Sequence, residues 1–91
     1  MEKFADMSLD AFTAALASKE AVPGGGGAAG LAGALAAALG AMVCNLTSGK
    51  KKYAEYEADI AAALEKLELT RKYMLRLVDE DAKAFQPLQK Y

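Results

Sequence analysis

The chain has 91 residues, enough for one small domain, and a formal net charge of −1. That balance excludes a strong whole-chain attraction to nucleic acid or to an anionic membrane. With one cysteine and no histidine, the chain forms no internal disulfide and is poorly equipped for zinc, and its acid–base groups are Asp, Glu, Lys, Tyr and Cys. We therefore expect no metal site and a cytoplasmic location, which the absence of an apolar signal segment at Met1 also favours.

The first predicted element is a short helix over residues 9–18. Ser8 is a suitable N-cap, and Leu9, Phe12 and Leu16 follow it at helical spacing on one face. Residues 19–27 are predicted to form a loop, because a proline and four consecutive glycines disfavour the interiors of helices and strands.

A second helix is predicted over residues 28–47, within a run that carries no charge from Ala21 to Gly49. The run is long enough to cross a membrane, but its alanines and glycines favour a buried helix of a soluble bundle over membrane insertion. Small residues recur at four-residue spacing along two ridges: Gly26, Gly30, Ala34, Ala38 and Gly33, Ala37, Ala41. Such ridges let another helix approach closely, so we expect neighbours on most sides.

A third helix is predicted over residues 51–85, after a stop or kink at Gly49 and before a terminating Gln86-Pro87. Its apolar stripe has a period near 3.6 residues and consists of Ile60, Leu64, Leu67, Met74, Leu75, Val78, Ala82 and Phe85. No alternating strand pattern is present. The predicted fold class is all-α, a helical bundle with long helices.

The glycine cluster is the first candidate site. Residues 25–30 match G-x-G-x-x-G by letter, but a helix rather than a strand is predicted before them, which disfavours a dinucleotide site. A glycine-rich helix start exposes backbone N–H groups and partial positive charge to an anionic or carbonyl-rich ligand. The alternative is that these glycines form a flexible linker followed by a tightly packed helix and bind no ligand.

The second candidate site is the basic run Lys50-Lys51-Lys52, followed by Tyr53 and Tyr56. Lysines at a helix end can hold carboxylates, and a tyrosine can stack on a flat ring. An ordinary solvated surface is the alternative.

The third candidate is the acidic run Asp79-Glu80-Asp81. With Val78 at the stripe centre, a step of about 100° per residue places Asp81 about 60° and Asp79 about 100° from that centre. Asp81 is thus expected to face packed apolar surface, which suits a group that exchanges a proton. Because Arg71 lies about 20° from the stripe centre, a structural ion pair between Asp81 and Arg71 remains an alternative.

Four segments resemble the formiminotransferase-cyclodeaminase family, in order and in spacing. They are Ser8-Leu9 with Phe12, Pro23-Gly24-Gly25-Gly26, Asn45-Leu46-Thr47-x-Gly49-Lys50-Lys51-x-Tyr53 and Leu77-x-Asp79-x-Asp81-Ala82-x-x-Phe85. The resemblance implies an all-helical dimer that binds folate in a cleft including the subunit interface. It implies release of ammonia from 5-formimidoyltetrahydrofolate to give 5,10-methenyltetrahydrofolate. Some relatives are assigned as methenyltetrahydrofolate cyclohydrolases.

Carried over residue by residue, the resemblance implies that the catalytic residues are Asp81, as the proton-transferring carboxylate, and Asp79 of the same motif. The implied folate-binding residues are Pro23, Gly24, Gly25, Gly26, Asn45, Thr47, Lys50, Lys51 and Tyr53. A tetrahydrofolate derivative is then the substrate, and no tightly bound cofactor is expected. The family usually has a serine or another small residue at the position of Gly27, so glycine there lacks a hydroxyl group that could contact the ligand.

Members of the family are longer than this chain. Residues 1–91 are therefore expected to be the N-terminal part of a single cyclodeaminase-like domain, completed by a second copy or by a C-terminal half. A non-catalytic helical assembly module, in which the small-residue helix mediates pairing, is the alternative from another functional class.

Overall fold

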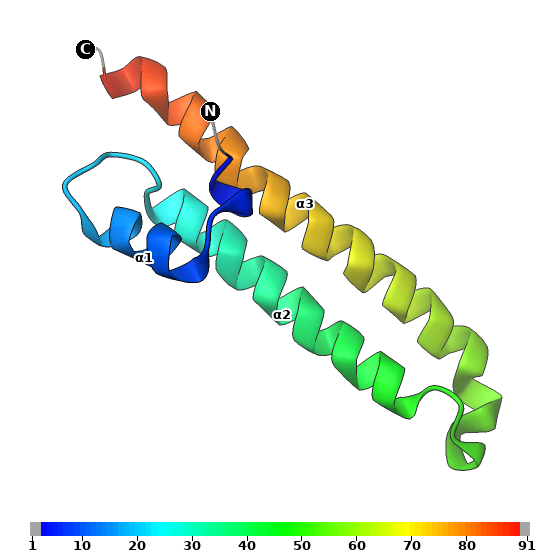
Figure 1. Cartoon of the computed structure of the whole chain (residues 1–91). Helices are drawn as coiled ribbons and strands as arrows, with labels where there is room; N and C mark the ends of the chain where they lie inside the picture. Colours follow the sequence, from blue (N-terminus) through cyan, green and yellow to red (C-terminus); the bar gives the residue numbers. More distant parts are fainter. Residues whose placement is uncertain (1–2, 90–91) are drawn as a thin grey trace.

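The computed structural model describes the backbone of residues 3–89 and the side chains of residues 3–83. Two long helices, α2 (Gly25–Thr47) and α3 (Glu57–Gln89), lie side by side and run in opposite directions (Figure 1). They form a hairpin that gives the molecule extents of 58 × 23 × 20 Å. No strand occurs within residues 3–89, so the predicted all-α class is confirmed.

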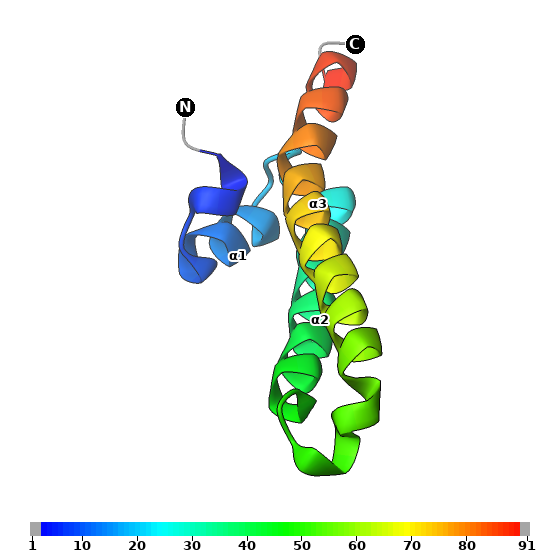
Figure 2. The same ribbon diagram turned by 90° about the vertical axis from the view of Figure 1, so that its right-hand side faces the viewer.

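The N-terminal residues form a separate, shorter layer. A single 3₁₀ turn, η1 (Phe4–Asp6), precedes α1 (Leu9–Ala17), and both lie to one side of the α2–α3 pair (Figure 2). The side chain of Ser8 accepts a hydrogen bond of 3.0 Å from the Ala11 N–H, which confirms the predicted N-cap. Phe12 of α1 is buried, and its ring meets the ring of Phe4 edge-on at 6.3 Å between centroids.

The small residues of α2 face α3. Gly30, Ala34, Ala37 and Ala41 are all buried along this side. A Cβ atom added at Gly30 would lie 2.9 Å from the Met74 carbonyl oxygen, closer than real Cβ atoms approach. The two backbones therefore touch where a side chain larger than hydrogen does not fit, which is the close approach that the ridges predict.

The opposite face of α2 is exposed. It carries five large apolar side chains, here called the outer stripe: Leu35, Leu39, Met42, Val43 and Leu46. The expectation of neighbours on most sides is therefore wrong for this chain. The described residues supply one long helix and one short one, which cover only part of the circumference of α2.

By length and composition alone, α2 is apolar enough to cross a membrane, and 28% of its most apolar window is buried. The core helix of a soluble protein passes the same test, so this finding is weak evidence for a membrane.

Helix α2 begins three residues earlier than predicted, at Gly25 rather than at residue 28. Gly24 is its N-cap, and the first intrahelical bond runs from the Ala28 N–H to the Gly24 carbonyl at 3.0 Å. Glycines cost helix propensity in the interior of a helix, but this first turn is held by its packing against α3. Pro23 and Val78 both lie in van der Waals reach of Gly27.

The hairpin turn contains the predicted stop at Gly49, whose φ of 83° favours glycine. The continuous helix predicted from residue 51 is wrong, because residues Lys51–Tyr56 form a 3₁₀ segment, η2, with a non-helical Tyr53. Helix α3 begins only at Glu57 and continues beyond Pro87 to Gln89. The predicted end of this helix before Pro87 is therefore wrong, because the fixed φ of a proline is compatible with a helix although its ring disfavours the interior.

The α3 stripe is best buried near its C-terminal half. Val78 is 2% exposed and Ala82 is 6% exposed, while the predicted stripe members from Ile60 to Leu75 are half-buried. Phe85 lies outside the described side chains. The core of the described residues thus follows the interface between α2 and α3, from Ala41 to Val78 and Ala82, and Phe12 of α1 joins it.

Candidate functional site

The carboxylate of Asp81 lies directly on the backbone of Gly26. A Cβ atom added at Gly26 would overlap both carboxylate oxygens, so only glycine leaves room for this side chain. Helix α3 presents Asp81 toward the first turn of α2. Two segments that are far apart in the sequence, the glycine cluster and the acidic motif, therefore form one structural unit, here called the glycine–aspartate end.

This end of α2 combines unpaired donors with an adjacent carboxylate. The N–H groups of Gly25, Gly26 and Gly27 come before Ala28, whose N–H makes the first intrahelical bond, so they have no partner within the helix. Such a helix start favours acceptor oxygens and negative charge. Among the described side chains, none forms a hydrogen bond or ion pair with Asp81. The arrangement can hold a carbonyl-rich ligand beside a free acid–base group.

The predicted apolar burial of Asp81 is wrong, because this side chain is exposed. The residue opposite it on α2 is a glycine, which covers little surface. Asp79, placed by the wheel at the stripe margin, is instead the half-buried carboxylate of the pair. The helical wheel gives the direction of each side chain around α3, but it takes no account of other segments. In the structure, η1 covers Asp79.

Asp79 accepts two backbone hydrogen bonds from the N-terminal turn. Its Oδ1 atom accepts from the Phe4 N–H at 2.7 Å, and its Oδ2 atom accepts from the Ala5 N–H at 3.3 Å. Both donors are at the start of η1, where no intrahelical acceptor exists. The two carboxylates of the acidic motif thus have different surroundings.

The remaining predicted site residues gather at the other end of α2, here called the lysine end (residues 45–53). Asn45, Lys50 and Lys51 are exposed there. The Thr47 hydroxyl donates to the Val43 carbonyl at 2.7 Å, which leaves it engaged with its own helix. The Lys52 ammonium lies 5.5 Å from the centroid of the half-buried Tyr53 ring, within cation–π range.

Glu57 organises the lysine end and was missed by sequence reasoning. Its carboxylate accepts from the Ser48 hydroxyl at 3.0 Å and also from the Gly49 N–H. It is the first residue of α3, so it joins the two ends of the hairpin turn. An acidic residue at a helix start, eight positions after a glycine stop, was the available signal.

Within one chain, the two groups of predicted site residues are not brought together. The 23 residues of α2 separate them, and a rise of 1.5 Å per residue makes that distance about 33 Å. Pro23, Gly24, Gly25, Gly26, Asp79 and Asp81 lie near one end, and Asn45, Thr47, Lys50, Lys51 and Tyr53 lie near the other.

Arg71 has a partner other than Asp81. Its Nη2 atom lies 2.9 Å from the Glu68 carboxylate, one helical turn away. The hydrogen bond from Arg71 holds the pKa of Glu68 below its ordinary value of 4.5. An ion pair between Arg71 and Asp81 is therefore absent from the described chain.

No cluster of three or more His, Cys, Asp or Glu side chains is placed to hold a metal ion in the part of the chain that the structure describes.

Comparison with known proteins identifies the family of this chain. The family model of formiminotransferase-cyclodeaminase matches residues 8–91. A methenyltetrahydrofolate cyclohydrolase of Methylorubrum extorquens is 50% identical over 78 residues, which are 86% of this chain and 38% of that protein. A formimidoyltransferase-cyclodeaminase of Rattus norvegicus is 34% identical over 80 residues, 88% of this chain and 15% of the relative. The chain thus spans well under half the length of these relatives, and it belongs to the formiminotransferase-cyclodeaminase family.

Proposed function

We propose that this chain contributes a folate-binding and proton-transfer site to an enzyme of one-carbon chemistry. The favoured reaction converts 5-formimidoyltetrahydrofolate to 5,10-methenyltetrahydrofolate and ammonia. The observation that carries the proposal is the contact between Asp81 and Gly26, because it joins an exposed carboxylate to the amide donors of a helix start. Membership of the family supplies the substrate class.

In this reaction, N10 of the folate attacks the carbon of the protonated formimidoyl group and forms a five-membered ring. The Asp81 carboxylate accepts the proton that N10 loses. It then returns a proton to the exocyclic nitrogen as the bond from carbon to that nitrogen breaks. Ammonia leaves, and the cationic methenyl bridge remains. One exposed carboxylate with no ion-pair partner is sufficient for this relay.

The amide donors of the glycine–aspartate end are suited to the carbonyl-rich pterin ring, and Lys50 and Lys51 are suited to the carboxylates of the glutamate tail. Because these groups lie about 33 Å apart along α2, one bound folate does not reach both in the same chain. We therefore propose that a second copy, or the helices present in the longer relatives, completes each site. A dimer with antiparallel hairpins places the lysine end of one copy near the glycine–aspartate end of the other.

The second candidate reaction is hydrolysis of 5,10-methenyltetrahydrofolate. The relative that is 50% identical carries the name methenyltetrahydrofolate cyclohydrolase, which favours this alternative. Here Asp81 accepts a proton from water as the water oxygen adds to the bridge carbon, and it returns a proton to N5 as the bond from that carbon to N5 breaks. The added hydroxyl group loses its proton to solvent, which leaves a formyl group on N10. The same carboxylate serves both reactions, so the residues alone do not separate them.

The deciding experiment offers each folate to the purified protein. Ammonia release with appearance of the methenyl chromophore supports the cyclodeaminase, and loss of that chromophore supports the cyclohydrolase. In either case Asp81→Asn is expected to lower kcat by about 10²–10⁴-fold, the usual contribution of general acid–base catalysis, with helicity unchanged. Glu80→Gln, an exposed neighbour, is the matched control. Turnover at the parental rate in a folded Asp81→Asn variant would remove Asp81 from the mechanism.

A further inference from the structure

The N-terminal residues form a strap against the α2–α3 hairpin, on the side of Asp79. This N-terminal strap, residues 3–17, comprises η1 and α1 and crosses from α3 to the start of α2 (Figure 1). Its contacts with the hairpin are few. They consist of apolar side chains around a small cavity and of the two hydrogen bonds that Asp79 accepts.

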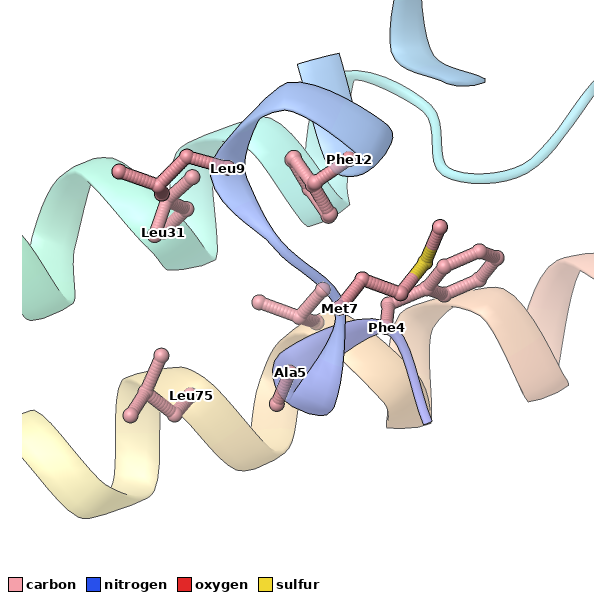
Figure 3. A pocket seen from close by; sticks show the side chains of 8 residues that line it. Phe4, Ala5, Met7, Leu9, Phe12, Leu31 and Leu75 are labelled. Carbon is pink, nitrogen blue, oxygen red and sulfur yellow. The ribbon is translucent and has the colours of Figure 1, made fainter. Parts of the chain in front are cut away.

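The cavity lies beneath the strap and is lined by apolar groups. Its volume is about 50 Å³, and Figure 3 shows side chains of the strap facing Leu31 of α2 and Leu75 of α3 across it. Val78 lines the same cavity and has its other side against Gly27 and Gly30. The strap therefore completes the burial of Val78, while the cavity itself is too small for a folate or another drug-sized ligand.

Asp79 provides the polar attachment of the strap. The donors at Phe4 and Ala5 are 75 and 74 residues away in sequence, so the bonds join separate layers of the fold. Hydrogen bonds to a charged acceptor are stronger than those between neutral groups. Apolar contacts around an incompletely filled cavity are weaker than close packing. The carboxylate of Asp79 therefore contributes a large share of the free energy that holds the strap against the hairpin.

We infer that Asp79 is a positioning residue, which holds the N-terminal strap against α3 by its contact with the start of η1. It is thus distinct in role from Asp81, two residues further along the helix. When Asp79 is removed, the strap separates from the hairpin and uncovers Phe12, Val78 and the cavity wall beside the glycine–aspartate end. The α2–α3 hairpin persists, because its interface is made by the small residues of α2.

Limited proteolysis of the full chain tests this inference. Chymotrypsin cleavage after Phe12, which is 4% exposed, requires the strap to open. When opening is fast, the cleavage rate follows the population of the open form. Asp79→Ala is expected to raise that rate about tenfold or more, from the usual strength of hydrogen bonds to a charged acceptor. Asp79→Asn keeps one acceptor oxygen and should give an intermediate rate.

The matched control is Glu80→Ala, which makes the same kind of change at an exposed neighbour and should leave the Phe12 rate unchanged. Amide hydrogen exchange in α2 and α3 is measured in parallel and should not change in the Asp79 variants. An unchanged Phe12 rate in Asp79→Ala would overturn the inference. So would an equal acceleration of exchange in all helices, because Asp79 would then support global stability rather than the strap. If Asp79→Ala does not fold, Asp79→Asn decides by the same two measurements.

Discussion

Two aspartates of one motif have different environments because different segments cover them. Asp79 is bonded to backbone N–H groups of the strap, whereas Asp81 lies exposed against Gly26. Both carboxylate oxygens of Asp79 are thus engaged with the strap. Asp81 is the group that we propose for proton transfer, and the glycine beside it determines where its oxygens lie.

Gly25 and Gly26 form a matched pair for testing that contact. A Cβ atom at Gly25 meets nothing within 4 Å, whereas one at Gly26 overlaps the Asp81 carboxylate. Gly25→Ala should therefore leave both stability and kcat close to parental values. Gly26→Ala should displace Asp81, which can rotate into solvent, so the melting temperature changes little while kcat falls by about tenfold or more toward the loss expected for Asp81→Asn. Equal kcat values for the two variants would contradict this role of Gly26.

The exposed lysines give a second prediction at this scale. Replacing Lys50 and Lys51 with Ala should weaken binding of polyglutamylated folate more than binding of monoglutamylated folate, because the additional carboxylates lose their positive partners. The difference should shrink at high salt, since exposed charges are screened within about 8–10 Å at physiological ionic strength. Isothermal titration with both ligands measures it, and Lys66→Ala on α3 is an exposed control. Equal losses for the two ligands would mean that Lys50 and Lys51 only face solvent.

At the scale of elements, small residues determine how closely α2 and α3 approach. Periodicity in the sequence was sufficient to predict the start of α1 at Leu9 and the ridges of α2, but it placed Asp81 against apolar surface, where the structure has it exposed. The rise per residue already implied that Lys50 and Gly26 are far apart. The contacts of Asp79 with Phe4 and of Glu57 with Gly49 were not predictable in this way. They depend on how short segments dock, and helical periodicity carries no information about that docking.

Two glycines of α2 differ in whether the part of α3 that they contact can move. A Cβ atom at Gly30 would lie 2.9 Å from the Met74 carbonyl oxygen and 3.1 Å from Val78 Cγ2. The three atoms nearest to a Cβ atom at Gly33 all belong to the flexible side chain of Met74. Gly30→Ala should push the helices apart and lower the free energy of unfolding by about 1–3 kcal/mol, the usual penalty of overpacking.

Gly33→Ala is the control for this prediction. Met74 can change rotamer, and alanine has the higher helix propensity, so this substitution should destabilise the protein much less. Urea denaturation monitored by circular dichroism measures both variants. A smaller loss for Gly30→Ala than for Gly33→Ala would contradict the proposed backbone contact.

At the scale of the whole molecule, the hairpin has two features that a single copy does not account for. The predicted folate-binding residues are divided between its ends, and the outer stripe of α2 faces solvent. A helix that is apolar on all sides is typically buried. Antiparallel pairing of two hairpins through their outer stripes would cover that surface and would also bring opposite ends of the two copies together. The same surface is what a non-catalytic assembly module would use, so pairing and turnover have to be measured separately.

We expect the chain to self-associate through the outer stripe. Sedimentation at micromolar concentration should give a mass above that of the 9.5 kDa monomer. Leu39, 60% exposed at the middle of the stripe, is the position to change. Leu39→Lys introduces a charge into the pairing surface and should weaken association by about tenfold or more, since an unpaired charge is costly to bury. Leu69→Lys makes the same change at a similarly exposed site on α3 and should leave the mass unchanged. If the parent chain sediments as a monomer with full helicity, the outer stripe does not mediate pairing. If Leu39→Lys dissociates the assembly and also abolishes turnover, while Leu69→Lys does neither, each active site requires groups from two copies.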